Sequence, residues 1–212
     1  MRKRVGARVA DAQPVSFVLY WGKGPRDVLA DPDLQCLRFL STMAQRIKDA
    51  HAPGAAIKLI FTDTHAELNG HSRQAALGYF DSVLNRATEF GFAGCLLGDL
   101  VAEATRTPGF AVSEQEPETD VLEKLHACAR KWYGGEDSLQ GAKTYYQANM
   151  VEKLAVELAF PDSIFVTFNG SEFRSLFPAR MPIFYMYSTK RGCAVKPWFV
   201  AAPAETAEAL TV

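Results

Sequence analysis

Short apolar runs alternate along the chain with segments in which apolar residues recur every three or four positions. The runs VSFVLYWG (15–22), AAIKLIFTD (55–63) and DSIFVTFNG (162–170) are rich in β-branched and aromatic residues and end in turn-forming ones. This pattern predicts buried strands. The run AGCLLGDLV (93–101), which lies between the second and the last of these runs, could be a further strand or a short buried helix.

Helical periodicity fills the stretches between these runs. We expect Asp31 to cap the first helix, because Pro32 follows it at the first helical position. Apolar spacing predicts helices over residues 31–51, 72–91, 120–135 and 138–161.

The remaining segments predict less regular structure. Aromatic residues alternate over 181–200, which predicts a C-terminal hairpin that turns at TKRG. The acidic, proline-containing stretch 107–119 predicts a mobile loop. Residues 1–14 and 201–212 are expected to be loose tails.

The order of these segments indicates the fold class. Strands that alternate with helices predict parallel pairing, with helices on both faces of the sheet. We therefore expect an α/β protein: a Rossmann-like three-layer sandwich with a mainly parallel sheet and a C-terminal hairpin. The sequence has no internal repeat and no linker, so residues 1–212 are expected to form one catalytic domain.

Composition and charge exclude several classes of protein. A formal net charge of -1 excludes a positive field over the whole protein, although a local basic patch stays open. The four cysteines form no CxxC pair, which argues against a zinc ribbon. No apolar run reaches membrane-spanning length, and the basic N-terminus lacks the apolar segment of a signal peptide. We expect a soluble cytoplasmic protein without a membrane partner.

Three polar stretches, YWGKGPRD, TDTHAELNGH and TFNGSEF, follow the predicted strands. Ligands of open parallel sheets bind beyond the carboxyl ends of the strands, so these stretches should meet at one edge. GKGPR lacks the spacing of a phosphate-binding fingerprint, but its glycines would let backbone N–H groups approach an anion. The substrate-binding candidates here are Tyr20, Gly22, Lys23, Asp63, His65, Asn69 and Asn169.

A metal site is an alternative interpretation of the second stretch. Asp63, His65 and His71 are ligand types for a transition metal, but their spacing matches no strong motif. A histidine that simply hydrogen-bonds to Asp63 explains the same residues. We therefore predict no metal and no cofactor.

The predicted helix 138–161 carries a dense set of polar groups. Tyr145, Asn149 and Lys153 are four residues apart and share one face, which Glu157 extends. Glu152 is turned about 100° from Lys153. We favour Glu157 as the group that recognises a substrate amine, with Lys153 tuning it or taking a proton. Tyr145 is a candidate proton relay, and the remaining substrate-binding candidates on this helix are Asn149 and Glu152.

This layout resembles the cyclodipeptide synthases. The resemblance rests on the strand that ends in TD, on VEKLAVELAFPDSIF, and on the aromatic strand after it. It implies a fold related to class I aminoacyl-tRNA synthetase catalytic domains, and a reaction that joins amino acids taken from charged tRNAs. It also implies catalytic roles for Glu157 and for a tyrosine of the final strand, Tyr185 or Tyr187.

The chain departs from that family at two positions. YWGKGPRD holds no serine or cysteine to carry an aminoacyl group, and Lys153 stands where the family has a tyrosine four residues before its glutamate. Direct attack of one bound amine on the other ester would then be required. Aminoacyl-tRNA is the partner that the resemblance implies, and a homodimer stays open. The local cations that could contact phosphates are Lys3, Arg4, Arg130, Lys131 and Lys143.

Two other functions stay open. FTDTHAELNG and YFDSVL show a looser similarity to isocyanide synthases of the dityrosine and pyoverdine type. That similarity implies a tRNA-independent enzyme that modifies an amino acid or another small polar metabolite. The third alternative is a protein of the same fold that binds a small molecule without chemistry.

Overall fold

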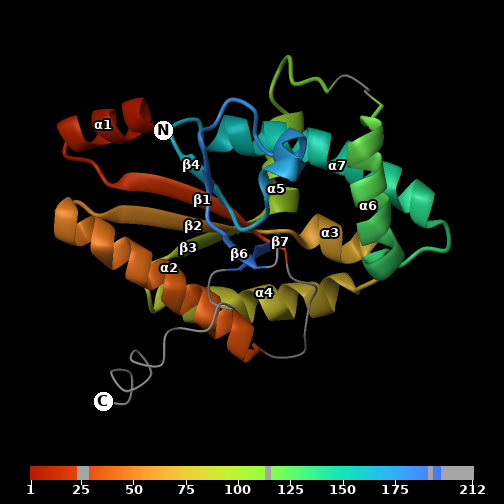
Figure 1. Cartoon of the computed structure of the whole chain (residues 1–212), viewed down its shortest axis with the longest axis horizontal. Helices are drawn as coiled ribbons and strands as arrows, with labels where there is room; N and C mark the ends of the chain where they lie inside the picture. Colours follow the sequence, from red (N-terminus) through yellow and green to blue (C-terminus); the bar gives the residue numbers. More distant parts are fainter. Residues whose placement is uncertain (23–28, 113–115, 191–192, 197–212) are drawn as a thin grey trace.

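The computed structural model describes residues 1–22, 29–112, 116–190 and 193–196 (Figure 1). Its helices are α1 (Arg2–Ala10), α2 (Asp31–Ala50), α3 (Asp63–Leu68), α4 (Arg73–Thr88), α5 (Leu97–Thr105), α6 (Thr119–Trp132), α7 (Ser138–Ala159) and the 3-10 helix η1 (Ser171–Leu176). Its strands are β1 (Val15–Trp21), β2 (Ala55–Phe61), β3 (Ala93–Leu96), β4 (Ile164–Thr167), β5 (Ile183–Tyr185), β6 (Ser188–Lys190) and β7 (Cys193–Val195).

Strands β1 to β5 form an open, parallel sheet in the order β3-β2-β1-β4-β5. β1 pairs with β2 along its whole length, from Val15 opposite Ala55 to Trp21 opposite Phe61. On its other side β1 pairs with β4, which comes much later in the chain. The direction of strand addition therefore reverses at β1, the kind of position where open α/β sheets bind ligands. The expected Rossmann-like α/β fold is confirmed.

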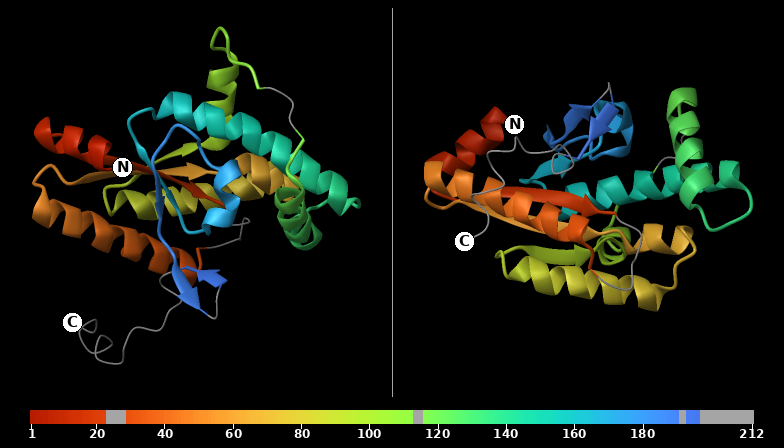
Figure 2. Two further views of the ribbon diagram at one scale, coloured as in Figure 1. Left: turned by 45° about the horizontal axis from the view of Figure 1, so that its top comes forward. Right: turned by 60° about the horizontal axis from the view of Figure 1, so that its bottom comes forward.

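Helices cover both faces of the sheet (Figure 2). Parallel strands are buried on both faces, which explains why their sequences are almost continuously apolar. On one face α2 and α4 bury Leu37, Leu40, Tyr79, Phe80 and Val83 against Phe17, Leu19 and Leu59. On the other face α5 and α7 bury Leu97 and Val156 against Val18, Ile60 and Phe165.

The N-terminal segment is a helix, so the expectation of a loose tail over 1–14 was wrong. Val5 of α1 packs against the core, and Arg4 Nη1 donates a hydrogen bond of 2.8 Å to the carbonyl of Ser163. Arg8 lies 3.6 Å from Asp162. The many charges of MRKRVGARVA obscured a helix that attaches through one valine and two arginines. The other expected tail, 201–212, lies outside the described residues.

The polar stretch after β2 folds into α3, which the sequence did not predict. Gly70, with a φ of 78°, and the hydrogen bond from the His71 N–H to the Ala66 carbonyl reverse the chain after this short helix. The Gly134 N–H then donates 3.0 Å to the carbonyl of Leu68, which brings the corner between α6 and α7 against the end of α3. A Cβ on Gly134 would lie 2.6 Å from the Gly70 Cα, so this approach needs glycine.

Other boundaries differ in smaller ways from the predicted ones. The run 93–101 is both a strand and a helix, because β3 passes directly into α5 at Leu97. The first long helix includes Asp31, and it is the Asp33 carboxylate that accepts a 3.0 Å hydrogen bond from the N–H of Ala30. Asp31 is therefore not the cap.

The C-terminal segment 181–200 contains more than the predicted hairpin. β5 joins the main sheet, where Phe184 lies opposite Val166 of β4. The hairpin itself is shorter and consists of β6 and β7, with Lys190 paired to Cys193. Residues 197–200 lie outside the described residues.

Candidate functional site

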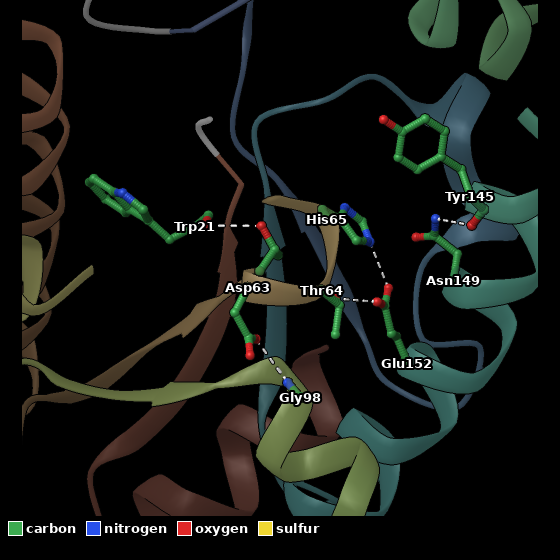
Figure 3. A network of polar contacts seen from close by, with 9 residues as sticks. Trp21, Asp63, Thr64, His65, Gly98, Tyr145, Asn149 and Glu152 are labelled. Carbon is green, nitrogen blue, oxygen red and sulfur yellow. Dashed lines mark hydrogen bonds and ion pairs between the residues drawn. The ribbon is translucent and has the colours of Figure 1, made fainter. Parts of the chain in front are cut away.

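At the carboxyl ends of β1 and β2, Trp21 lies close to the start of the polar stretch that holds Asp63, Thr64 and His65 (Figure 3). Trp21 ends β1, and its carbonyl accepts hydrogen bonds from both the N–H and the hydroxyl of Thr62, at 3.3 and 3.2 Å. Thr62 in turn precedes α3. The edge of the sheet therefore fixes where α3 begins, next to the reversal between β1 and β4.

Asp63 is buried and braces the sheet edge. Its Oδ1 accepts a 2.9 Å hydrogen bond from the N–H of Gly98 in the first turn of α5, where a carboxylate also complements the helix dipole. A Cβ on Gly98 would lie only 2.7 Å from the other oxygen of Asp63. Asp63, predicted to bind substrate, therefore joins α3 to α5.

Glu152 is the centre of the most buried polar cluster at this edge. Thr64 Oγ1 donates 2.7 Å to its Oε1, and His65 Nε2 lies 2.8 Å from its Oε2. The Glu152 side chain is 3% exposed, while that of His65 is 23% exposed. A buried carboxylate of α7 is thus satisfied by two neighbouring side chains of α3, and its histidine partner reaches the surface.

The electrostatics of the pair favour a protonated histidine. Burial by itself would lower the pKa of His65, but the charge and hydrogen bond of Glu152, with the charge of Asp63, outweigh it and raise that pKa. His65 is therefore charged over a wider pH range than an isolated histidine. This makes it a group that can exchange a proton near neutral pH.

Tyr20 of β1 faces the α7 side of the sheet, and its ring meets Phe165 edge-on at 5.0 Å. The Tyr20 hydroxyl is buried and has no hydrogen-bond partner among the described residues. Burial, and then the charges of Glu152 and Glu157, raise the pKa of Tyr20 well above its usual value. A buried hydroxyl without a partner costs free energy, so it is a candidate for contact with a ligand.

Tyr145 and Asn69 connect α7 to the end of α3. The Tyr145 hydroxyl donates a hydrogen bond to Asn69 Oδ1, and its ring lies edge-on to His65 at 6.1 Å. Burial, with Cys128 and Tyr133 nearby, raises the pKa of Tyr145 to about 12. Asn149 Nδ2 donates 2.7 Å to the Tyr145 carbonyl on the same helix. The structure thus brings Tyr145, Asn69 and His65 together.

Glu157 and Lys153 are engaged with a different segment. The Arg180 N–H donates 2.9 Å to Glu157 Oε1, and Arg180 Nε lies 3.9 Å from Oε2. Lys153 Nζ donates 2.9 Å to the carbonyl of Ser175. Burial, opposed by Glu157 and helped by Arg174, lowers the pKa of Lys153. Lys153 therefore holds η1, and Glu157 holds the stretch between η1 and β5. The charge of Glu157 also reaches Tyr20.

Three more predicted site residues lie at strand ends. Gly22 follows β1, and a Cβ there would lie 3.4 Å from Thr62 Oγ1. The Asn169 N–H donates 3.1 Å to Thr167 Oγ1 after β4. Tyr185 of β5 meets the rings of Phe177 and Tyr187 edge-on. Lys23 lies outside the described residues.

Sequence reasoning missed Thr64, Gly98 and Arg180. Thr64 follows Asp63 in a stretch that was already a candidate, but only the helical turn of α3 directs its hydroxyl at Glu152. Gly98 and Arg180 contribute backbone N–H groups to Asp63 and Glu157, and side-chain identity gives no signal for such contacts.

The described residues of this edge form no metal site. Within the ranges that the structure describes, no group of three or more His, Cys, Asp or Glu side chains is placed to hold a metal ion. Two cavities are lined by other parts of the fold. One, of about 580 Å³, lies between α1 and α2, and one of about 300 Å³ lies at the start of the strands beside Phe160. The candidate site therefore rests on side-chain chemistry and on the topology of the sheet.

Fold and site together define a Rossmann-like α/β protein with a buried acid–histidine pair at the strand reversal. Among solved structures, the PvcA protein from Pseudomonas aeruginosa matches with a TM-score of 0.57 at 19% identity, over 92% of this chain and 75% of that one. A tryptophanyl-tRNA synthetase homologue from Entamoeba histolytica matches with a TM-score of 0.47 at 12% identity, over 82% of this chain and 45% of that one. The likeness to PvcA supports the fold.

Other comparisons add no family. No protein-family model matches the sequence, and no curated protein matches it. Over the residues that the structure describes, no helix combines the length and the apolar character needed to cross a bilayer.

Proposed function

We propose that the protein is a biosynthetic enzyme that acts on the amino group of an amino acid or of an aminoacyl ester. The observation that carries this proposal is the group formed by Tyr20, Glu152 and His65. The buried hydroxyl of Tyr20 has no hydrogen-bond partner among the described residues, and the charges of two buried carboxylates, Glu152 and Glu157, act on it. A ligand that brings a cation and hydrogen-bond donors would complete this arrangement, and a substrate ammonium group offers both.

In this proposal the ammonium group binds beside the Tyr20 hydroxyl, attracted by Glu152 and Glu157. Glu152 accepts the Nε2 proton of His65, which leaves Nδ1 of the neutral imidazole free to accept a proton. His65 then removes a proton from the bound ammonium and releases the amine as a nucleophile. Lys153, with its lowered pKa, is a second proton acceptor beside Glu157.

The specific reaction that we propose to test first is cyclic dipeptide formation from two aminoacyl-tRNAs. The released amine of one aminoacyl group attacks the ester carbonyl of the other; a first amide bond forms, and the ribose oxygen of the second tRNA leaves with a proton. The free amine of the resulting dipeptidyl ester then attacks the remaining ester carbonyl, which closes the ring with a second amide bond and releases the other ribose oxygen with a proton. Thr62, Thr64 and Thr167 have their hydroxyls in hydrogen bonds at the strand ends, which is a poor arrangement for a covalent acyl carrier. Direct attack between two bound esters suits these residues better.

One observation favours the second candidate, a tRNA-independent enzyme that modifies a free amino acid. Three cations of the described residues are held by protein groups: Arg73 by Glu67, Lys153 by Ser175, and Arg174 by the carbonyls of Phe177, Pro178 and Ala179. Such cations are less available for phosphates than unpaired ones. A free amino acid needs no phosphate contacts, so it fits this surface without rearrangement.

Metabolite analysis of a bacterial host that expresses the chain tests the proposal. New cyclic dipeptides would support the first reaction, and a different amino-acid-derived product would support the second. The product should disappear with Glu152→Gln and persist with Glu67→Gln, a matched change on the exposed side of α3. No new product, together with calorimetric binding of an amino acid to the purified protein, would leave a binding protein and contradict the enzyme.

A further inference from the structure

A second candidate site lies on the opposite face of the sheet from Glu152. A cavity of about 580 Å³ opens between α1 and α2, over the start of β1 and the end of β5. This volume falls within the range of about 300–1,000 Å³ that small-molecule sites occupy. Its apolar lining consists of Val5, Val9, Val15, Phe39, Met43, Ile47, Ala50, Phe184 and Met186.

These apolar side chains belong to the main core but are left partly uncovered. Val15 and Met186 are buried, whereas Val5, Phe39 and Phe184 pack against the core only in part. Val9 is 49% exposed at the edge of the groove. The cavity is lined by side chains of both α1 and α2, two helices whose places beside the sheet can be followed in Figure 1. An apolar ligand that filled the groove would gain the free energy of removing this apolar surface from water.

The polar side chains of the groove indicate the other end of such a ligand. Thr42 donates its hydroxyl hydrogen bond to the Arg38 carbonyl, and His51 Nε2 lies 2.9 Å from the Gln13 carbonyl. Arg46, one turn along α2 from Thr42, also lines the groove, and its side chain makes no hydrogen bond or ion pair with any described residue. A guanidinium group next to an apolar groove complements a carboxylate, which it can bind with two parallel hydrogen bonds.

We propose that this groove binds an aliphatic carboxylate of medium chain length, with the hydrocarbon chain against Phe39, Met43 and Met186 and the carboxylate on Arg46. The site is separate from the edge that carries Glu152, and it does not depend on the proposed function. Its ligand belongs to a chemical class that the polar side chains around Glu152 would not bind.

Methionine methyl groups offer a direct test with decanoate as the probe. In protein with carbon-13-labelled methionine methyls, decanoate should shift the signals of Met43 and Met186, which line the groove. Met150 and Met181 belong to apolar clusters on the α7 side of the sheet, so their methyl signals should not shift. Shifts of Met150 or Met181 alone, or no shift at about 1 mM, a weak affinity for any specific ligand, would overturn the proposal.

Chain length and head-group charge separate this site from an unspecific apolar surface. Affinity should rise about fourfold for each added methylene between hexanoate and decanoate, the value for full transfer of a CH₂ from water. Arg46→Gln should weaken decanoate binding about tenfold. Arg38→Gln, an equal change at an exposed position of the same helix outside the groove, should leave it unchanged. Equal binding of decyltrimethylammonium, or an unaffected Arg46→Gln protein, would overturn the carboxylate assignment.

Two other occupants would also be revealed. If removal of residues 197–212 shifts Met43 and Met186 without ligand, the chain's own C-terminus covers the groove, and the proposal fails. If these signals move on dilution, a second copy covers it, and the proposal fails in the same way. Signals that respond to decanoate alone support the site.

Discussion

His65 Nε2 lies 2.8 Å from Glu152 Oε2, although 87 positions separate the two residues in the sequence. The contact joins α3, which follows β2, to α7, which precedes β4. It therefore bridges the two strands that flank β1. Any change to this pair should affect both the electrostatics of the site and the attachment of α3.

Replacing Glu152 with Gln keeps the shape of the side chain and removes its charge. We expect turnover of the amino-acid substrate to fall about 100-fold or more, the usual contribution of an oriented base, because His65 loses the group that fixes its tautomer. Glu157→Gln should weaken substrate binding as well, since we propose that both carboxylates attract the ammonium group. Initial rates measured across substrate concentrations separate the two effects. Full activity of the Glu152→Gln protein would remove the pair from the mechanism.

The protonation of His65 can be followed by NMR as a function of pH. Because Glu152 and Asp63 outweigh burial, His65 should titrate above its ordinary pKa of 6.5. A pKa that is raised by folding stabilises the protein fully below the unfolded value and loses this effect as the pH rises through the folded value. The stability lost by His65→Gln should therefore be largest below about pH 6.5 and shrink at higher pH. If His65→Gln lowered the stability equally at every pH, the result would contradict an ion pair between a protonated His65 and Glu152.

Tyr20→Phe should separate stability from function. The buried Tyr20 hydroxyl has no described partner, so its removal avoids a desolvation cost of about 1 kcal/mol or more in the ligand-free protein. We expect the variant to unfold at an equal or higher temperature than the natural protein. At the same time it should bind substrate more weakly, because the hydroxyl is proposed to contact the ammonium group. If the Tyr20→Phe protein were less stable to heat but fully active, the Tyr20 hydroxyl would have a structural role and would not contact the substrate.

Tyr145→Phe should loosen α3 from α7. The change removes the hydroxyl that donates to Asn69 and leaves the ring packing against His65 and Tyr133 in place. The loss should be about 1 kcal/mol in the free energy of unfolding, measured with urea. Tyr146→Phe on the same helix is the matched control, because Tyr146 is as buried and its hydroxyl makes no side-chain hydrogen bond with another described residue. Equal losses in both variants would argue against the contact.

Gly98→Ala should destabilise the protein although alanine is the better helix former. The new Cβ would lie 2.7 Å from Asp63 Oδ2 and would displace a buried carboxylate, which outweighs the gain of about 1 kcal/mol in helix propensity. Gly78→Ala in α4 has open space around its Cβ and should stabilise by about that amount. Thermal unfolding of the two variants should therefore shift in opposite directions. A stabilised Gly98→Ala protein would show that Asp63 can move freely.

The main elements of the fold could be predicted from the sequence because burial on two faces leaves continuous apolar runs. β1, β2 and β4 were recognisable in this way, as were α2, α4, α6 and α7 from their periodicity. α1 and α3 were not, because they are short and mostly polar, and what holds them is tertiary. Arg4 reaches the Ser163 carbonyl, and Thr64 reaches Glu152, in contacts that local pattern does not encode.

The candidate site could be predicted as a region but not as a set of roles. Topology alone places Tyr20, Asp63 and His65 at one edge of the sheet. The sequence of α7 could not predict which partner each of its two glutamates, Glu152 and Glu157, would have. Helical spacing put Lys153 and Glu157 on one face, but only the packing of α3 and of Arg180 decides which carboxylate meets which partner.

The position of β1 at the centre of the sheet has a consequence for biosynthesis. As the chain leaves the ribosome, β1 can pair with β2 early, but its other edge pairs with β4, at Phe17 to Leu19, only after Thr167 has been made. Until then the nascent protein carries an open strand edge flanked by apolar side chains, the feature most prone to wrong pairing between chains. The acid–histidine pair must wait for the same late segment, since α7 immediately precedes β4. A chain stalled before α7 would thus lack the acid–histidine pair and would be prone to aggregate. Synthesis of the α7–β4 segment therefore both completes the pair and covers the open edge of β1.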